Sequence, residues 1–451
     1  MSIKRIAASA ALGVCMTLAV TAAPATAAEA TSTPSSTAPL TLPQVSSATQ
    51  GAAWLAKQFN ASGYIPTAST PPGVDYISTA NAVLALASTG TYSAVAQRGL
   101  TYLSSHVNDY VKVDGSDGPG QLALLILDSH ALGKNPTSFG GTNLVARLIA
   151  TERTTGADKG LFGSQDPTYD GAYRQGLALA ALAGIGVTTA TQVKTAESWL
   201  ESQQCPDGGW TSLITSANPC NGNPADFEGP DTNSTALAIQ GLSAQGVLST
   251  TAAAAASKFI VGAQDGDGGW GYDPNAAHAP GFTDPDSTAL VIQAILALGK
   301  APSSATFEKG SSNPISALHA FQLTSGSGKG AFFFPGSTAP DLLATYQAVP
   351  AMARVSFPFN LAVTTSSLPK GSVGGSYSQT LAASGGTASR SWRLISGTLP
   401  AGLSLHSTTG VISGRPTHTG VSTFTVEVLD AESTTVPHTQ ATAWKTLSID
   451  I

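Results

Sequence analysis

The sequence predicts a multidomain α plus all-β protein, in which a closed (α/α)6 toroid of six helix pairs is followed by a β-sandwich. Three observations predict this fold. Two near-copies of one helical unit adjoin between Trp199 and Gly299, and weaker copies of the unit extend on both sides of them. After residue 357 the composition changes to Ser, Thr, Gly and Val with alternating apolar positions, which is typical of strands. At 451 residues the chain has room for two or three domains.

Each near-copy contains an amphipathic helix, a Gly-Gly-Trp turn, a loop and an almost wholly apolar helix. The first copy reads WLESQQCPDGGW and then DTNSTALAIQGL, and the second reads FIVGAQDGDGGW and then DPDSTALVIQAIL. The first helix mixes apolar and charged residues at helical spacing, as a half-exposed helix does. The second helix is apolar on nearly every side, so other elements must cover it all round. Six such covered helices inside six half-exposed ones make a closed toroid.

The same two helix types are expected six times between residues 49 and 354. An aromatic or apolar pair marks the outer helices and recurs at steps of 46 to 60 residues, which is long enough for two helices and two loops. These pairs begin at Trp54, Tyr102, Leu148, Trp199, Phe259 and Ala317. The expected inner helices span residues 78–87, 121–132, 175–185, 234–245, 287–298 and 341–353.

The Asp-Gly-Gly-Trp turns join the two helix types. Their glycines are expected to take the positive φ angles that end a helix. Each indole needs a partner for its N–H, and a Gln in the same register of each copy is a candidate. The residues concerned are Gln204, Gly208, Gly209 and Trp210 in the first copy and Gln264, Gly268, Gly269 and Trp270 in the second.

This repeat resembles that of squalene and other terpenoid cyclases and of protein prenyltransferase β subunits. The shared pattern is an aromatic and an aliphatic residue, three residues, Gln, three to five residues, and Gly-x-Trp. Trp199, Leu200, Gln204, Gly208 and Trp210 match it fully, as do Phe259, Ile260, Gln264, Gly268 and Trp270, whereas Ala317, Leu318, Gln322, Gly330 and Phe332 match with substitutions. The resemblance covers about 300 residues and implies a cyclase-type toroid.

Residues 357–451 are expected to form a separate β domain. The run from Leu399 to Asp430 resembles the immunoglobulin-like domain of bacterial surface and secreted proteins, which is related to cadherin-like folds. That relation implies calcium as one role for Asp430 and Glu432, and solvated acids at a strand end are the alternative. No other metal or cofactor is expected, because the histidines and cysteines lack His-x-x-His and Cys-x-x-Cys spacing.

Residues 1–27 are expected to be a secretory signal peptide. Lys4 and Arg5 precede an apolar run, and small residues end at Ala27. Residues 28–48 are rich in Thr, Ser and Pro and are expected to form a linker. No later stretch has the roughly 20 apolar residues that span a bilayer. We therefore expect a secreted protein without a transmembrane segment.

Two cysteines remain after such cleavage, Cys205 and Cys220, and in an oxidising compartment they are expected to form a disulfide. The loop of the first near-copy is seven residues longer than that of the second, as 24 positions separate Trp210 from Ser234 and 17 separate Trp270 from Ser287. Cys220 lies in this longer loop, and Cys205 lies just before its turn. The disulfide is therefore expected to stabilise an enlarged loop.

Acidic residues stand at the starts of the inner helices. Asp75, Asp231 and Asp284 each precede an aligned Ser by three positions, so a closed toroid gathers them at one mouth. One interpretation is that they cap the free N–H groups of their helices. The other follows from the resemblance, since class II terpenoid cyclases protonate an alkene with the middle aspartate of Asp-x-Asp-Asp. The nearest match is Asp284-Pro285-Asp286-Ser287, which would make Asp286 the acid although Ser287 replaces the last aspartate.

We favour capping for Asp284 and Asp286 alike, because it explains every copy. Three aromatic residues lie in or near the turn of the second near-copy: Trp270, Tyr272 and Phe282. They are expected either to line the mouth of the cavity or to pack in the core between helices. A small hydrophobic molecule or a glycan is the expected kind of ligand. Nucleic acid is excluded, since charged residues make up 11% of the chain and no Lys/Arg-rich run occurs.

The leading functional hypothesis is a secreted, non-catalytic binding or adhesion protein with a central ligand cavity. One alternative is a class II-type terpenoid cyclase that uses Asp286 as general acid. The other is a carbohydrate-active α/α toroid with paired mouth carboxylates. The oligomeric state stays open.

Overall fold

The computed structural model describes residues 42–163, 171–212, 220, 229–274, 282–359, 362–363, 365, 367–384, 390–430 and 442–451. The predicted signal peptide and the first part of the predicted linker lie outside these residues. The helical part also contains short elements: helix α5 (Val107–Val111), the 3-10 turns η1 (Pro136–Ser138) and η2 (Ala305–Phe307), and the two-stranded ribbon of β1 (Lys112–Val113) and β2 (Ser116–Asp117).

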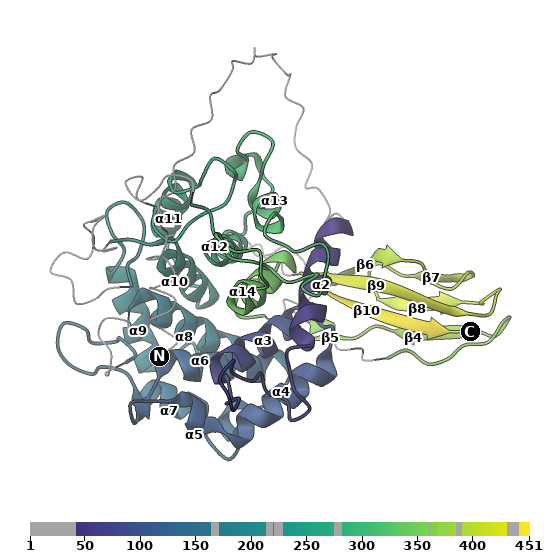
Figure 1. The fold of residues 1–451 in the computed structure, drawn as a ribbon, viewed down its shortest axis with the longest axis horizontal. Coiled ribbons are helices and arrows are strands. Elements are labelled where there is room, and N and C mark those ends of the chain that lie inside the picture. The colour runs from purple at the N-terminus through teal and green to yellow at the C-terminus, as the bar shows by residue number, and fades with distance from the viewer. Residues whose placement is uncertain are drawn as a thin grey trace, which may run out of the picture. The chain divides into compact units, whose positions relative to one another are not determined.

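Six inner helices in the described residues form a closed ring (Figure 1). Each contacts the next along the chain, and the last contacts the first. They are α3 (Tyr76–Thr89), α6 (Pro119–Ala131), α8 (Ala172–Gly184), α10 (Thr232–Ala244), α12 (Pro285–Ala297) and α14 (Leu342–Met352). The outer helices are α2 (Leu42–Ala56), α4 (Ser93–Ser105), α7 (Leu144–Ala150), α9 (Thr191–Ser202), α11 (Thr250–Gly262) and α13 (Pro314–His319). The predicted (α/α)6 toroid is confirmed.

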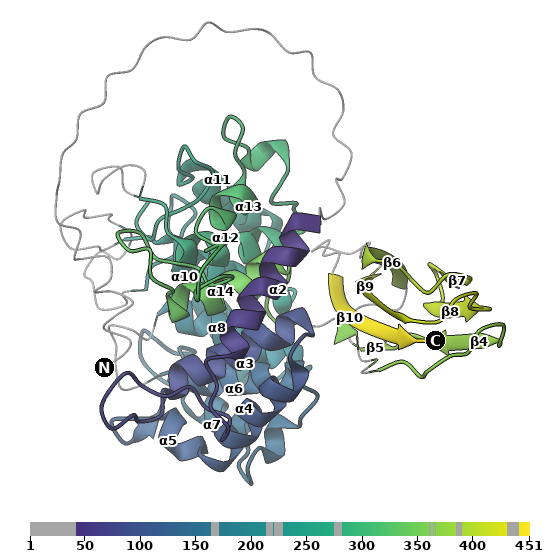
Figure 2. The ribbon, with the colours of Figure 1, turned by 45° about the vertical axis from the view of Figure 1, so that its right-hand side comes forward.

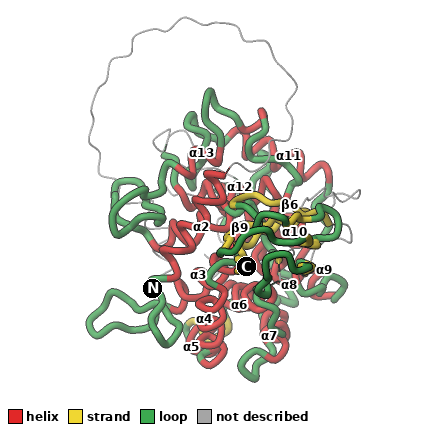
Figure 3. The backbone as a smooth tube through the Cα atoms, turned by 90° about the vertical axis from the view of Figure 1, so that its right-hand side faces the viewer, coloured by secondary structure: helices red, strands yellow, loops and turns green. Residues whose placement is uncertain are grey.

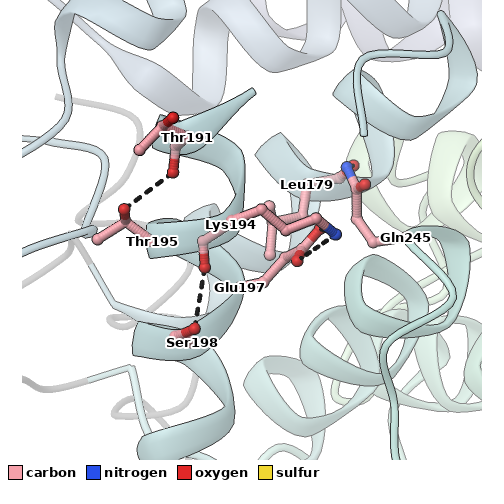
Figure 4. Close-up of polar contacts among 7 residues, drawn as sticks. All are labelled: Leu179, Thr191, Lys194, Thr195, Glu197, Ser198 and Gln245. Carbon is pink, nitrogen blue, oxygen red and sulfur yellow. Dashed lines mark hydrogen bonds and ion pairs between the residues drawn. The ribbon is translucent and has the colours of Figure 1, made fainter. Parts of the chain in front are cut away.

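Burial separates the two rings as the apolar pattern predicts. Nearly every residue of α12 is buried, whereas α9 buries only the stripe that faces inward, at Val193, Ala196, Glu197, Trp199 and Leu200. The solvent side of α9 is polar (Figure 4). There Ser198 Oγ donates to the Lys194 carbonyl at 2.9 Å. The exposed Lys194 also reaches the inward stripe, where its Nζ pairs with Glu197 at 2.8 Å. This pair gives the nearly buried Glu197 carboxylate a counter-charge.

Helix α2 corrects the predicted linker. The helix begins at Leu42, so residues 42–48 are helical rather than linker. It packs against α14 and α3, which joins the last helical unit to the first (Figure 2). Ala48 is fully buried, and Ser47 Oγ donates to Gln322 Oε1 at 2.6 Å. Small Ala and Ser side chains suit this close contact but carry little hydrophobic signal, which is why the composition resembled a linker.

The Gln residues of the repeat do not bind the indoles. Trp210 Nε1 donates to the Leu200 carbonyl and Trp270 Nε1 to the Ile260 carbonyl, both at 2.8 Å, so the predicted Gln partners are wrong. Instead, Gln264 Nε2 donates to the carbonyls of Gly268, in its own turn, and of Phe307, in the next unit. The Gln side chains therefore link consecutive units, and the indole N–H stays within its own unit.

Only one glycine of each Gly-Gly pair has positive φ. Gly208 and Gly268 have φ values of +99° and +91°, whereas Gly209 and Gly269 do not lie in the left-handed region. The second glycine is needed for space, since a Cβ on Gly269 would lie 2.3 Å from Thr283 Cγ2. The expectation of positive φ at all four positions is thus half right.

The residues after 361 form antiparallel sheets, whose strands are yellow in Figure 3. One sheet has the order β10-β9-β6, another has the order β4-β8-β7, and β3 pairs with β5. Phe424, Val426 and Val428 alternate along β9 and pack with Trp392 and Ile412 in a separate core. The strands are β3 (Ala362–Val363), β4 (Tyr377–Thr380), β5 (Ala383–Ser384), β6 (Arg390–Gly397), β7 (Leu403–Leu405), β8 (Val411–Gly414), β9 (Val421–Asp430) and β10 (Thr442–Asp450). This arrangement agrees with the predicted immunoglobulin-like domain.

The crossing of α8 and α10 gives a test of the ring. A Cβ on Gly241 would lie 2.4 Å from the Gly176 carbonyl oxygen, so Gly241→Ala should lower the free energy of unfolding by roughly 1–3 kcal/mol. The matched control is Gly262→Ala in α11, where a Cβ meets no neighbouring atom within 4 Å, and it should stabilise by up to about 1 kcal/mol. Denaturant unfolding measures both, and equal stability of Gly241→Ala and the wild type would contradict this packing.

Candidate functional site

A cavity of about 50 Å³ lies on the axis of the inner ring and is lined by residues of all six inner helices. Its walls include a layer of five leucines, one from each of α3, α6, α8, α10 and α12: Leu84, Leu124, Leu177, Leu237 and Leu290. Polar side chains interrupt the apolar lining at Asn81, Tyr173, Gln293, Tyr346 and Gln347. That volume holds a few water molecules. It is smaller than the roughly 300 Å³ at which small-molecule pockets begin.

The segment after α14 closes the end of the cavity where the inner helices terminate. Phe357 lines the cavity, and its N–H donates to Gln240 Oε1 at 2.9 Å. Gln293 Nε2 donates to the Val355 carbonyl at 3.1 Å. Gly184, the last residue of α8, has no room for a Cβ, which would lie 2.8 Å from Pro358 Cβ. The sequence indicated only a domain junction here.

The opposite end, where the inner helices begin, carries the predicted aspartates. Asp75, Asp231 and Asp284 are N-caps whose Oδ1 atoms accept the N–H groups of Ser78, Ser234 and Ser287 at 3.0, 2.6 and 2.7 Å. Asp341 caps α14 in the same way. The capping interpretation is confirmed for these residues.

Burial raises the pKa of Asp231 and of Asp284 to about 6, against the lowering effect of their cap hydrogen bonds. Asp284 also accepts a hydrogen bond at 2.8 Å from the hydroxyl of Ser287, the residue that replaces the last aspartate of the cyclase motif. Each carboxylate is therefore engaged with the start of its own helix, at a cost in desolvation.

Asp286 is not a cap, which corrects the interpretation made for it from the sequence. Asp284 occupies the cap position of α12, and Asp286 follows Pro285 inside the first turn. Its side chain is buried, and its Oδ1 has no hydrogen-bond partner. Leu290 and Gln293, which line the cavity, follow it by four and seven positions. Because residues at this spacing share one helix face, Asp286 lies on the cavity face, one turn closer to the mouth than Leu290.

Burial holds the pKa of the Asp286 carboxyl well above its usual range, and the charges of Asp284 and Asp341 raise it further. Both effects favour the neutral form of this carboxyl. Two cavity-lining hydroxyls lie close enough to sense it, since its charge adds to burial in raising the pKa of Tyr173 (to about 12) and of Tyr346. Asp286, Tyr173 and Tyr346 thus form a cluster of polar groups near the cavity.

The aromatic residues predicted at the mouth have different places. Trp270 is fully buried between helices and does not line the mouth. The Tyr272 hydroxyl lies 3.2 Å from Ser212 Oγ, and the Tyr272 carbonyl accepts the N–H of Thr232 at the start of α10. Phe282 is 44% exposed, with its ring centroid 6.3 Å from that of Phe334. Tyr272 and Phe282 therefore border the helix starts, and Trp270 belongs to the core.

The predicted disulfide is present between Cys205 and Cys220, whose Cα atoms are 5.4 Å apart. In the chain-entropy model, a bridge of this span stabilises by about 3 kcal/mol. Most of the enlarged loop that it closes lies outside the described residues.

Within the described part of the chain, no group of three or more His, Cys, Asp or Glu residues is arranged to hold a metal ion. The side chain of Asp430 and all of Glu432 lie outside that part, so calcium there stays a prediction. None of the described helices combines the length and the apolar character needed to cross a bilayer.

Asp128 is a buried acid that the sequence analysis passed over. It lies on α6 four positions after the cavity-lining Leu124, and neither carboxyl oxygen has a hydrogen-bond partner. Burial holds its pKa well above the usual range. The signal was a lone acid in the apolar run LLILDSHA.

Asp284 and Asp286 should respond oppositely to substitution. Asp286→Leu removes a buried carboxyl with an unpaired oxygen and should raise the free energy of unfolding by roughly 1–3 kcal/mol. Asp284→Ala removes a helix cap and should lower it by about 1 kcal/mol. Denaturant unfolding at neutral pH measures both changes. A loss of stability in Asp286→Leu would show that the carboxyl has a structural partner.

The cap at Asp231 should make stability depend on pH. Because its pKa in the folded state is raised to about 6, the folded protein binds more protons than the unfolded chain between about pH 4 and 6. Its contribution therefore falls as pH rises through this window, by on the order of 3 kcal/mol. Relative to Asp231→Asn, which can still cap, the wild type should lose stability from pH 4 to 7. A constant difference would refute the shift.

Two parts of the chain match known families. Residues 144–327 match the squalene-hopene cyclase C-terminal domain, and residues 359–443 match the family described as "Putative Ig domain". A comparison with curated proteins found no match.

Several solved structures are similar to 69% of the chain. They include a protein from Actinoplanes (15% identity, 99% of that chain, TM-score 0.49), a variant of the type II terpene cyclase MstE from Scytonema in complex with merosterolic acid A (13%, 97%, 0.47) and a glycosidase variant (14%, 96%, 0.42). At these identities and TM-scores the similarities do not bear on activity. The two family matches agree with the architecture, in which a squalene-hopene cyclase-like helical toroid precedes an Ig-like β domain.

Proposed function

We propose that the chain is an exported binding protein whose toroid takes the apolar part of a small molecule into the mouth side of its axial cavity. Asp286 carries this proposal. Its carboxyl is buried on the cavity face, has an oxygen without a partner, and stands above a layer of leucines. A protonated carboxyl in apolar surroundings is a hydrogen-bond donor for the polar end of a ligand.

The shape of the cavity limits the ligand. Phe357 and its hydrogen bond to Gln240 close the far end, so a ligand enters from the side of the aspartate caps. The leucine walls favour an apolar body, and Asp286, Tyr173 and Tyr346 favour an acceptor such as a carbonyl or hydroxyl oxygen at one end. With about 50 Å³ on the axis, most of the ligand would lie nearer the mouth.

Export is supported by the predicted signal peptide and by the disulfide, since disulfides persist in oxidising compartments. A role in adhesion is supported only by the match of residues 359–443 to an Ig domain. Both are parts of the proposal.

The test is to recover the full chain from the culture medium and to identify co-purifying small molecules by mass spectrometry. The wild type should retain an apolar molecule that bears a hydrogen-bond acceptor. Asp286→Leu should retain at least about tenfold less, the equivalent of roughly 1.4 kcal/mol. Asp284→Asn, which leaves the cavity face unchanged, serves as control and should retain as much as the wild type. Equal retention by Asp286→Leu would contradict the proposal.

A class II-type cyclase is the second candidate, and the raised pKa of the buried Asp286 favours it, because such a reaction needs a proton donor in an apolar cavity. Ser287 in the last position of the motif speaks against it, since its hydroxyl is bound to Asp284. Incubation with squalene should return it unchanged. A cyclised product that disappears in Asp286→Asn would replace the binding proposal with the cyclase.

The carbohydrate-active alternative draws less support from the geometry. Asp75, Asp231 and Asp284, the acids expected to form a catalytic pair, each cap the start of a helix. A glycosidase needs one acid and one base that face a bound sugar.

A further inference from the structure

We infer that the outer helix α4 carries a saccharide-binding groove that is separate from the axial cavity. The groove has a volume of about 360 Å³, within the range of small-molecule sites. We call it the α4 groove. Its lining comes from Ser62 and from two rows along one helix face, Gln97, Thr101 and Ser105 in the first and Arg98, Tyr102 and His106 in the second.

The two rows follow from helix geometry. Residues four positions apart lie one above the other, so the rows run side by side along α4 and onto its C-cap. The row of Gln97, Thr101 and Ser105 is uncharged and polar, and the row of Arg98, Tyr102 and His106 holds a guanidinium group and two flat rings. A ligand that lies along the helix therefore meets hydrogen-bonding groups on one side and ring surface on the other.

The rings form a half-exposed platform. Tyr102 and His106 stack with centroids 4.1 Å apart and planes at 17°. The ring centroid of Tyr102 lies 4.7 Å from that of Tyr64 and 6.3 Å from that of Tyr76. The side chains of these three tyrosines and of His106 are partly exposed. The hydrophobic clusters of the described helical residues include Tyr76 but neither Tyr64 nor Tyr102. Core packing therefore accounts for Tyr76 but not for Tyr64 and Tyr102, and of the four rings Tyr102 and His106 line the groove. The C–H face of a pyranose packs on such ring surfaces.

The polar groups suit hydroxyl ligands. His106 Nδ1 donates to the Tyr102 carbonyl at 2.8 Å, so the neutral imidazole offers Nε2 as an acceptor. Arg98 Nη1 makes only a 3.4 Å contact with the Ala94 carbonyl of its own helix, which a ligand oxygen can replace. Gln97, Thr101 and Ser105 each donate to a backbone carbonyl, so they offer a ligand hydroxyl their side-chain oxygens as acceptors.

The combination selects against other small ligands. An apolar molecule would use none of the polar groups and would take the exposed Arg98 guanidinium out of water. A phosphate is held by several cations or backbone N–H groups together, and Arg98 is the single Lys or Arg among the described residues that line the groove. A neutral oligosaccharide uses both the rings and the polar row.

The test is calorimetric titration of the full chain with cellobiose and with N,N′-diacetylchitobiose as probes. The wild type should bind at least one of them, at roughly millimolar affinity or tighter. Tyr102→Ala should bind at least about tenfold more weakly. Thr101→Trp, a substitution at an exposed helix position that fills the groove, should abolish binding. Tyr92→Asn is the matched control, because it removes an exposed ring outside the groove at a left-handed residue that Asn tolerates, and it should bind as the wild type does.

Unfolding curves establish that each variant is folded. The proposal is overturned when the folded wild type binds neither probe, or when folded Thr101→Trp binds as tightly as the wild type. Asp286→Leu should keep full saccharide binding, so the outcome here is independent of the axial cavity.

Discussion

The six inner helices must be covered on every side, and this constraint determines the rest of the helical domain. A helix such as α12, buried along nearly its whole length, cannot face water on any flank. Closing six of them into a ring, with outer helices around it, satisfies that requirement. The ring then leaves two places for polar chemistry, the starts and the ends of the inner helices, where backbone groups lack partners within the helix.

The free backbone groups at the starts and at the ends of the inner helices are covered in different ways. At the starts, Asp75, Asp231, Asp284 and Asp341 cap their helices. At the ends, the segment around Phe357 covers the axis and is fixed by Gln240 and Gln293. Asp286 fits neither solution, because it is buried in the first turn of α12, next to the cap rather than in it, and its Oδ1 has no hydrogen-bond partner. Such a group costs stability, and a binding role is a reason to keep it.

Periodicity made the ring, its helix types and the caps predictable. Asp284 could be assigned as a cap from its place three residues before Ser287, since a cap depends only on local geometry. The hydrogen-bond acceptor of the Trp270 indole could not be assigned from the sequence. The Ile260 carbonyl and the Gln264 side chain can both accept this bond, and the path of the backbone selects Ile260. The burial of Ser47 and Ala48 also depends on contacts with distant segments, as the bond from Ser47 to Gln322 shows.

The candidate site was less predictable than the fold. Asp284 and Asp286 differ by two positions, yet one contacts its own helix start and the other lies on the cavity face, and the sequence analysis treated them alike. Phe357 lines a cavity whose walls come from helices far away in the sequence, of which the first, α3, ends at Thr89. No local sequence pattern could therefore place Phe357 at the cavity. The rings beside the α4 groove come from α4 and its C-cap, from the start of α3 and from the loop that holds Tyr64, and only folding brings Tyr64 and Tyr102 together.

The protonation state of Asp286 is the central claim. Infrared difference spectroscopy between the wild type and Asp286→Asn at pH 7 tests it directly. Burial beside Asp284 and Asp341 favours the protonated carboxyl, so we expect the C=O stretch of a neutral carboxylic acid in the wild type and its absence in the variant. A carboxylate band in its place would mean that Asp286 is ionised and paired, and would contradict the account of the axial site.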